Sequence, residues 1–322
     1  MSYRVVFTDH TFDDLDVERE VLADVDAEVV DGERSEEPNE TLVVGADALL
    51  VMFDTVDAAL MDAMPDCQIV SRTGIGLDNI DVEAATERGI SVTNVPDYCI
   101  PEVSDHAMAL MLALARKVVE YDAQVGAGGW NVAEGRAMHR LETQTVGLVA
   151  FGHIAQAVCE KASGFGMDVL AHDPYLSDEE IRAGGAEPVD DLDDLLARSD
   201  FVSVHTPLTP ETEGLLDADA FSTMKDTAFV VNVARGGIVD QDDVIAALDA
   251  GEIAGAALDV LAEEPPAEDD PLRSHDRVIL TPHAAWHSSE SVVELREKAA
   301  KNVLDVLTGE VPHYLVNTEL AE

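Results

Sequence analysis

Three residues with chemically useful side chains follow apolar segments in the C-terminal half of the sequence. Arg235 stands in NVARGGIVD, Glu264 in LDVLAEEPP and His283 in LTPHAAW. A guanidinium can hold a carboxylate through two parallel hydrogen bonds, and an imidazole can exchange a proton with a hydroxyl oxygen near neutral pH. Glu264 could orient and charge that imidazole. Each residue alone could serve a surface ion pair, a polar turn or a loop cap, but the three together, after successive strand-like segments, favour a catalytic site.

A second segment has the spacing of a dinucleotide-binding loop. TVGLVAFGHIAQAV places Ala150, Gly152 and Ala155 in the slots of a GxGxxG pattern, between an expected strand and an expected helix. At Gly152 the backbone would approach a pyrophosphate, whose charge would lie on amide groups at the helix N-terminus, where His153 and Ile154 stand. Ala150 departs from the pattern, because glycine there makes the tight turn, and alanine requires a negative φ or strain of about 1 kcal/mol.

Asp173 supports the interpretation of this loop. It ends the next strand-like segment, VLAHD, about twenty residues further on, where a carboxylate can accept hydrogen bonds from ribose hydroxyls. A carboxylate at this place repels a 2′-phosphate, and no arginine follows directly to hold one. The sequence therefore favours NAD(H) over NADP(H), while a surface acid at the end of a strand is the alternative.

Short apolar segments rich in Val and Ile alternate with helix-compatible stretches along the chain. The strand-like segments are RVVFTD, ALLVMFD, QIVSRTG and ISVTNVP, followed later by TVGLVAF, MDVLAHD, FVSVHTP, TAFVVNVA, IAGAALDV and RVILTPH. Such alternation indicates parallel sheets covered by helices, with ligands beyond the carboxyl ends of the strands. Because 322 residues exceed what one core usually organises, we predict an α/β fold with two doubly wound parallel-sheet domains.

The domain boundaries follow from two connecting segments. The turn-rich VPDYCIPE near Pro96 closes the first series of strands, and a long amphipathic helix is predicted over residues 103–125. A further helix after His283 leaves too little sequence for a third core and is expected to return to the first domain. We therefore predict a discontinuous domain formed by residues 1–98 and 288–322, and a cofactor domain over residues 99–287.

The charge of the chain limits its partners. The sequence holds 66 acidic and 19 basic residues, for a formal net charge of −47, which would repel nucleic acid and anionic membrane surfaces. The acidic residues are spread over the whole chain, which favours an origin in a salt-rich cytoplasm, where charges are screened over about 3 Å at 1 M salt. An ordinary acidic protein is the alternative. The N-terminus lacks the pattern of a signal peptide, so a cytoplasmic location is expected.

The three cysteines do not form a metal-binding or disulfide pattern. Cys67, Cys99 and Cys159 show no CxxC spacing and have apolar neighbours, which is typical of buried thiols in a reducing compartment. No metal is expected. Cys99 lies close to the predicted domain connection, where a reactive thiol is the alternative to a core residue.

Several strings in the same order resemble the D-isomer-specific 2-hydroxyacid dehydrogenase family over nearly the whole chain. They are GIGLDNID, NVPDYCIPEVSDHAMAL, VGLVAFGHI, HTPLTPET, NVARGGIVD, AALDVLAEEPP and TPHAAWHS. DYCIPEVSDHA and Trp286 look most like the branch that contains the C-terminal binding proteins. The resemblance implies a homodimer of two-domain subunits, each with a Rossmann-type cofactor domain, a flavodoxin-like substrate domain and an active site in the cleft beside the cofactor domain.

The resemblance also implies roles for single residues. Arg235 would grip the carboxylate and the 2-oxo oxygen of a small 2-oxo acid, His283 would be the acid/base, and Glu264 would keep its imidazole protonated for reduction. Backbone amides at Ile75 and Gly76 would form a second grip on the carboxylate. The residues expected to bind the cofactor are Ala150, Gly152, His153, Ile154, Asp173, Thr206, Pro207, Ala234, Asp259 and His283, of which Asp259 would lie near the nicotinamide carboxamide.

Two points stay open in the sequence. Trp286 would either wall the substrate pocket, favouring an apolar or thioether side chain, or pack near a hinge. Phosphoglycerate, glyoxylate and branched-chain oxo acids all remain candidates for the substrate. The alternative to an enzyme is an NADH-sensing regulatory protein of the same fold, although all three catalytic positions hold competent residues.

Overall fold

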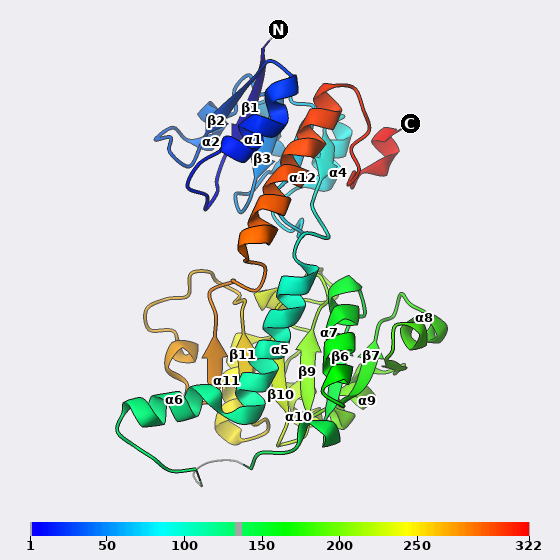
Figure 1. Cartoon of the computed structure of the whole chain (residues 1–322). Coiled ribbons are helices and arrows are strands. Elements are labelled where there is room, and N and C mark those ends of the chain that lie inside the picture. The colour runs from blue at the N-terminus through cyan, green and yellow to red at the C-terminus, as the bar shows by residue number, and fades with distance from the viewer. Residues whose placement is uncertain (1, 133–136, 322) are drawn as a thin grey trace. The chain divides into compact units, whose positions relative to one another are not determined.

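The computed structural model describes residues 2–132 and 137–321. The chain divides into two compact units, unit 1 with Met1–Cys99 and Ser288–Glu322, and unit 2 with Ile100–His287 (Figure 1). The first boundary lies one residue after the position expected from the sequence. Unit 1 is therefore made from both ends of the chain, whereas unit 2 is continuous.

Unit 1 contains a five-stranded parallel sheet in the order β2-β1-β3-β4-β5. This is the flavodoxin-like strand order. The strands are β1 (Tyr3–Phe7), β2 (Ala27–Asp31), β3 (Ala48–Val51), β4 (Ile69–Arg72) and β5 (Ser91–Thr93). The helices are α1 (Asp16–Val21), α2 (Asn39–Leu42), α3 (Ala58–Asp62), α4 (Val82–Glu87) and α12 (Ser289–Leu307), with 3-10 turns η1 (Leu22–Asp24) and η5 (Thr318–Ala321).

Strand β2 was not among the predicted strands. This strand lies at the edge of the sheet, its residues are only partly buried, and its sequence AEVVD contains two acids. An edge strand has one neighbour and needs less apolar sequence than a central strand such as β3, whose four residues are all buried.

Helix α12 is the C-terminal contribution to unit 1. Its buried residues include Leu295, Ala299 and Val303, which recur every four positions and therefore share one face of the helix. The Ser71 hydroxyl, on β4, donates a hydrogen bond of 3.0 Å to the carbonyl of Ala299. The predicted return of the chain to the first domain is thus made by an amphipathic helix packed on the sheet.

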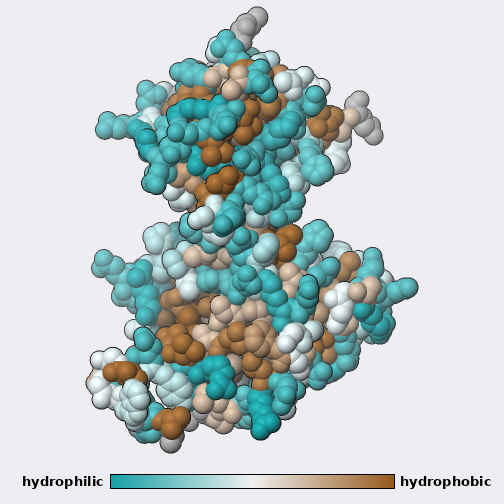
Figure 2. All heavy atoms as spheres, viewed as in Figure 1, coloured by the Kyte–Doolittle hydropathy of each residue, from teal (hydrophilic) through white to brown (hydrophobic). Residues whose placement is uncertain are grey.

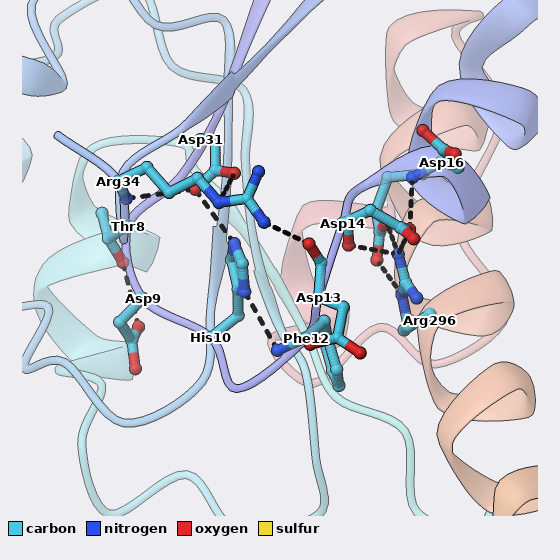
Figure 3. Close-up of polar contacts among 11 residues, drawn as sticks. Thr8, Asp9, His10, Phe12, Asp13, Asp14, Asp16, Asp31, Arg34 and Arg296 are labelled. Carbon is cyan, nitrogen blue, oxygen red and sulfur yellow. Dashed lines mark hydrogen bonds and ion pairs between the residues drawn. The ribbon is translucent and has the colours of Figure 1, made fainter.

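An ion pair fastens α12 to the N-terminal helix α1 (Figure 3). The guanidinium of Arg296 donates two hydrogen bonds, of 2.8 and 2.7 Å, to the carboxylate of Glu18, and it contacts Asp14 at 3.3 Å. Arg296 is 7% exposed and Glu18 is 1% exposed. The Arg296 guanidinium also lies 4.7 Å from the centre of the Phe12 ring, as a cation over an aromatic face.

His10 lies beside this ion pair, in the loop that follows β1 (Figure 3). Its ring stacks on Phe12, with 5.6 Å between the centroids and 9° between the planes. The Phe12 amide donates to Nδ1 at 3.1 Å, so the ring proton is on Nε2, which lies 3.1 Å from Asp31. Both nitrogens of this buried imidazole are therefore engaged.

Unit 2 contains a seven-stranded parallel sheet in the order β12-β11-β10-β9-β6-β7-β8. The strands β8-β7-β6-β9-β10-β11 follow the Rossmann order, and β12 extends the sheet by one strand next to β11. The strands are β6 (Thr145–Val149), β7 (Asp168–His172), β8 (Glu187–Pro188), β9 (Phe201–Val204), β10 (Phe229–Asn232), β11 (Gly255–Leu258) and β12 (Val278–Leu280).

Helices and 3-10 turns connect the strands of unit 2. The helices are α5 (Ile100–Arg116), α6 (Val118–Gly126), α7 (His153–Gly164), α8 (Asp178–Ala183), α9 (Leu192–Arg198), α10 (Ala218–Thr223) and α11 (Gln241–Ala250), and the turns are η2 (Leu141–Thr143), η3 (Gly236–Ile238) and η4 (Pro271–Ser274). The six predicted strands are all present. The two-residue edge strand β8 is too short to leave an apolar pattern in the sequence.

The single helix predicted over residues 103–125 is two helices. Lys117 separates α5 from α6 and has a left-handed backbone with φ 54° and ψ 36°. A left-handed residue cannot continue a right-handed helix, so the chain changes direction there. The apolar pattern continues across the break and for that reason did not reveal it.

Candidate active site

The predicted cofactor and catalytic residues of unit 2 all follow the carboxyl ends of its strands. Because the strands are parallel, these ends share one edge of the sheet. Ala150 and Gly152 follow β6, Asp173 follows β7, Thr206 and Pro207 follow β9, Ala234 and Arg235 follow β10, Asp259 and Glu264 follow β11, and His283 follows β12. The strand order reverses between β6 and β9, which is the place where open α/β sheets bind ligands.

His283 and Glu264 form a direct pair. Nδ1 of His283 lies 2.7 Å from a carboxylate oxygen of Glu264, and the two side chains are 32% and 34% exposed. A carboxylate accepts, so Nδ1 carries the proton of this hydrogen bond. Within the described residues Nε2 of His283 has no hydrogen-bond partner, which leaves it available for proton exchange.

The second oxygen of Glu264 is held by the backbone. The Leu261 amide donates to it at 2.8 Å. Partial burial acts to raise the pKa of Glu264, but the hydrogen bonds from His283 and from Leu261 outweigh burial and lower this pKa below its ordinary value. Glu264 is therefore ionised at neutral pH and presents a fixed negative charge to the imidazole.

The backbone of His283 is strained. Its φ of 52° lies in the left-handed region, which residues other than glycine rarely adopt and which costs about 1 to 3 kcal/mol. The amide of His283 donates to the Asp259 carbonyl at 2.7 Å. Such strain persists only where surrounding bonds fix it, and it is typical of functional sites.

The carboxylate of Asp259 supplies many of those bonds. It accepts hydrogen bonds from the amides of Ala284 and Ala285, both at 2.9 Å, and from the Thr281 hydroxyl at 2.6 Å. Burial acts to raise the pKa of Asp259, but these bonds and one from His106 together lower it. The side chain has no exposed surface, so Asp259 anchors the His283 loop, and its expected place beside a nicotinamide stays a prediction.

Arg235 lies in a turn that the buried Asn232 shapes. The Asn232 side chain accepts from the Ala234 amide at 3.0 Å and donates to the Arg235 carbonyl at 2.8 Å. Gly236 follows, and a Cβ there would lie 1.9 Å from the carbonyl carbon of Leu261. The turn of Arg235 therefore packs directly against the segment that leads to Glu264, and only glycine allows this approach.

The dinucleotide loop adopts the strained form that the sequence analysis considered. Ala150 has a φ of 71°. Gly152 caps α7, and a Cβ placed on it would meet no atom within 4 Å, so the space on that side of Gly152 is open. Asp173 accepts hydrogen bonds from the Phe151 amide and from the Tyr175 amide, both at 2.9 Å. Each of its oxygens keeps a further lone pair.

The predicted second grip on a carboxylate belongs to unit 1. Ile75 and Gly76 follow β4, and the Asn94 side chain donates to the Ile75 carbonyl at 2.7 Å. Gly74 has a φ of 150°, and the guanidinium of Arg72 fills the space where its Cβ would be, with 1.2 Å to Nη1. Arg72 was not among the predicted site residues, although it stands two residues before the glycine-rich string.

Two histidines near the site were also missed. His106 lies on α5, with Nε2 3.0 Å from the Thr281 hydroxyl. His205 follows β9, its Nε2 lies 2.9 Å from the Ser203 hydroxyl, and desolvation lowers its pKa to about 4.

Trp286 is half-buried and packs edge-on against the His287 ring, with 5.3 Å between centroids. No local sequence signal distinguishes these contacts.

The structure also limits other kinds of site. Over residues 2–132 and 137–321, no group of histidine, cysteine and acidic side chains could hold a metal ion. In the same part of the chain no helix has the length and apolar character needed to cross a membrane. All three cysteines are buried and free of disulfides.

Comparison with known families gives a match over more than half of the chain. Residues 108–285 match the family described as D-isomer specific 2-hydroxyacid dehydrogenase, NAD binding domain. A glyoxylate reductase from Korarchaeum cryptofilum is 42% identical over 284 residues, which are 87% of this chain and 85% of that protein. A D-3-phosphoglycerate dehydrogenase from Methanocaldococcus jannaschii is 38% identical over 91% of this chain, which spans 55% of that longer protein.

Solved structures agree with these sequence matches. The TT0316 protein from Thermus thermophilus superposes with a TM-score of 0.88 at 34% identity, covering 97% of this chain and 99% of that one. A D-lactate dehydrogenase from Aquifex aeolicus, complexed with NAD and lactic acid, gives a TM-score of 0.86 at 28% identity, covering 95% and 96%. An acyclic imino acid reductase in complex with NADPH and D-Arg gives 0.87 at 25% identity, covering 98% and 100%. Neighbours of this fold therefore include both NAD and NADPH complexes.

Proposed function

The chain belongs to the D-isomer specific 2-hydroxyacid dehydrogenase family, and from this premise we propose that it interconverts a small 2-oxo acid and its D-2-hydroxy acid with NAD(H). The observation that carries the proposal is the His283–Glu264 pair at 2.7 Å. The imidazole of His283, with no described partner on Nε2, follows β12 at the same edge of the sheet as the dinucleotide loop, and Arg235 follows β10, two strands along the sheet.

The residues of the dinucleotide loop fit NAD(H). The open space over Gly152 at the N-terminus of α7 suits a pyrophosphate. Asp173 retains lone pairs that can accept from ribose hydroxyls, and its negative charge disfavours a 2′-phosphate. We therefore propose that NAD(H) is preferred to NADP(H). When bound, this cofactor supplies or accepts the hydride at the carbon that carries the reacting oxygen.

The side chains of unit 2 would divide the remaining work. Arg235 would bind the substrate carboxylate and the 2-oxo oxygen, where negative charge develops during reduction. His283 would donate its Nε2 proton to that oxygen during reduction and remove it during oxidation, and Glu264 would stabilise the imidazolium. In unit 1, the amides of Ile75 and Gly76 would bind a carboxylate.

Substrate side-chain preference rests on Trp286 in this proposal. Its half-buried indole follows the His283 loop directly, and we propose that it favours an apolar or thioether side chain of the substrate.

The form of the DYCIPEVSDHA string favours a place in the branch of the family that contains the C-terminal binding proteins.

We also propose that the chain forms a homodimer through α6 and the segment after it. Val118, Val119 and Val125 are 56%, 49% and 47% exposed, and Trp130 is 90% exposed. Figure 2 shows some hydrophobic residues at the lower left, in the region of α6, besides other hydrophobic patches on the visible face. Exposed apolar residues on a chain of net charge −47 are typical of an interface. Light scattering should give twice the mass of one chain.

The charge itself supports a salt-rich cellular origin. With −47 charges over 322 residues, self-repulsion is relieved only where salt screens it. Purified protein should therefore be more stable and more active in molar KCl than in dilute buffer.

The deciding experiment is the loss of NADH absorbance in concentrated KCl with a panel of 2-oxo acids. The panel holds glyoxylate, pyruvate, branched-chain and thioether 2-oxo acids and 3-phosphohydroxypyruvate, with NADPH in parallel. Turnover with one class of side chain supports the proposal and identifies the substrate. Tight NADH binding without turnover on any acid would instead indicate an NADH-sensing regulatory protein.

A further inference from the structure

His106 is a histidine outside the proposed catalytic set that contacts the base of the His283 loop. It lies on α5, in the second turn of the helix that begins unit 2. Its Nε2 is 3.0 Å from the Thr281 hydroxyl and 3.4 Å from a carboxylate oxygen of Asp259. The side chain is 23% exposed, whereas that of Asp259 is fully buried.

The direction of these hydrogen bonds follows from their acceptors. The Thr281 hydroxyl has one proton, and it donates this proton to the Asp259 carboxylate at 2.6 Å. The hydroxyl can then only accept from His106, so Nε2 of His106 carries a proton. The resulting order is His106 Nε2–H to the Thr281 hydroxyl, and the Thr281 hydroxyl to Asp259.

Asp259 links the hydrogen bonds of His106 and Thr281 to the loop that carries His283. The same carboxylate accepts from the amides of Ala284 and Ala285, directly after His283. The Asp259 carbonyl accepts from the amide of His283. Asp259 therefore accepts four hydrogen bonds from the segment in which His283 has its left-handed φ of 52°, and His106 contacts this network from helix α5.

We propose that His106 is a positioning residue, which fixes through Thr281 and Asp259 the strained backbone that holds the His283 imidazole on Glu264. The proposal rests on the proposed function for its effect on turnover. His106 itself touches neither Glu264 nor His283 among the described contacts. It acts on the orientation of the proton donor and not on the binding of the dinucleotide.

The test compares two replacements of His106. His106→Leu removes the donor and keeps an apolar volume, and His106→Gln keeps an amide N–H that can reach Thr281. Because a hydrogen bond within a charged network is strong, we expect His106→Leu to lower kcat about tenfold or more and His106→Gln to restore most of it. The NADH dissociation constant should stay within about twofold of that of the unaltered protein.

Two further readouts separate positioning from general damage. A misaligned proton donor makes proton transfer more limiting, so the D2O isotope effect on kcat should rise in His106→Leu. In 15N-histidine-labelled protein, the downfield Nδ1 proton that His283 shares with Glu264 should be present in the unaltered protein and in His106→Gln, and lost or broadened in His106→Leu. Asp105→Asn is the matched control, because Asp105 is the neighbouring residue on α5, its side chain is 72% exposed and it pairs with Lys161.

Each possible result either supports or overturns the positioning role of His106. Unchanged kcat and an unchanged His283 proton signal in His106→Leu would overturn the inference, as would equal losses in His106→Leu and His106→Gln. If His106→Leu does not fold, the signal and turnover of His106→Gln decide the matter, since that variant must keep both. If the unaltered protein binds NADH and reduces no 2-oxo acid, the proposed function fails, and the His283 proton signal still tests the positioning role.

Discussion

The two units each contain a histidine paired with a carboxylate near the carboxyl end of a strand, and the pairs differ in what surrounds them. In unit 1, His10 has a side-chain exposure of 1%, with Asp31 on Nε2 and the Phe12 amide on Nδ1. In unit 2, His283 is 32% exposed, with Glu264 on Nδ1 and no described partner on Nε2. The residue types are nearly the same, and the second ring nitrogen distinguishes the pairs.

This difference distinguishes a histidine that serves the fold from the one that we propose for chemistry. When both nitrogens are used inside the fold, as in His10, no ring nitrogen is left for a substrate, and releasing one would break a buried hydrogen bond. When a carboxylate holds only one nitrogen, as in His283, the other has a defined direction and can face a substrate. Replacing the histidine should therefore lower turnover in unit 2 and stability in unit 1.

The largest effect is expected for His283→Ala. Removal of a general acid typically lowers turnover by about a hundredfold to ten-thousandfold. NADH binding and thermal stability should stay nearly unchanged, because a partly exposed and strained residue contributes little to the fold. Steady-state kinetics with the best 2-oxo acid and NADH titration measure both quantities, and retained turnover would contradict the proton-transfer role.

His10→Ala is the matched counterpart in unit 1. It removes the hydrogen bond from the ring to Asp31 and the ring acceptor of the Phe12 amide, so stability should fall by about 1 to 3 kcal/mol. The turnover of the folded protein should be kept. If this variant instead lost turnover at full stability, the division between structural and chemical histidines would be wrong.

A larger effect on stability than that of His10→Ala is expected for Arg296→Met. This change leaves the carboxylate of Glu18, which is 1% exposed, without its ionic partner, and breaking a buried pair in this way costs about 3 to 5 kcal/mol. Urea unfolding measures the loss. The double replacement Arg296→Met with Glu18→Leu removes both charges and should recover most of it, and failure to recover would show that packing and not charge makes the contact important.

His205 gives a pH-dependent effect of intermediate size. Its pKa in the folded chain is about 4, below the ordinary value of 6.5, so the folded state disfavours the protonated form. Its contribution to stability is complete above pH 6.5 and is lost as the pH falls toward 4. Between pH 7 and pH 5 the unaltered protein should lose about 1 to 2 kcal/mol more than His205→Gln. Parallel acid dependence of the two proteins would exclude this cause.

The smallest effect is expected for Ala150→Gly. Ala150 shares the left-handed backbone of His283, with a φ of 71°, but lies in the cofactor loop. Glycine removes the steric cost of this conformation and should raise stability by about 1 kcal/mol. Thermal unfolding measures the gain, and Ala155→Gly, inside α7, is a control that should lower stability instead.

Much of the fold could be predicted because its central strands are apolar throughout. Strands such as β3 and β9 are buried at every position, and burial on both faces requires continuous apolar sequence. The edge strands β2 and β8 are only partly buried, so they need no continuous apolar sequence and could not be predicted from one. The break at Lys117 was hidden because it depends on one backbone angle and not on the apolar pattern.

The site could be predicted in its chemical groups but not in its supports. Arg235, Glu264 and His283 are recognisable because each has a reactive side chain after an apolar segment, and their catalytic roles stay predictions. The contact of His106 with Thr281 joins residues 175 positions apart, and that of Arg296 with Glu18 joins residues 278 apart. No local pattern encodes such pairings, so only a three-dimensional structure reveals them.

Because unit 1 is made from both ends of the chain, it can be completed only at the end of synthesis. During synthesis all of unit 2 is made before α12, so the strands of unit 1 are present long before Leu295, Ala299 and Val303, which α12 buries in the complete unit. Glu18 likewise waits for Arg296 until 278 further residues have been added. Unit 1 therefore stays incomplete through most of translation. Termination before residue 288 would yield a complete unit 2 joined to an incomplete and aggregation-prone unit 1.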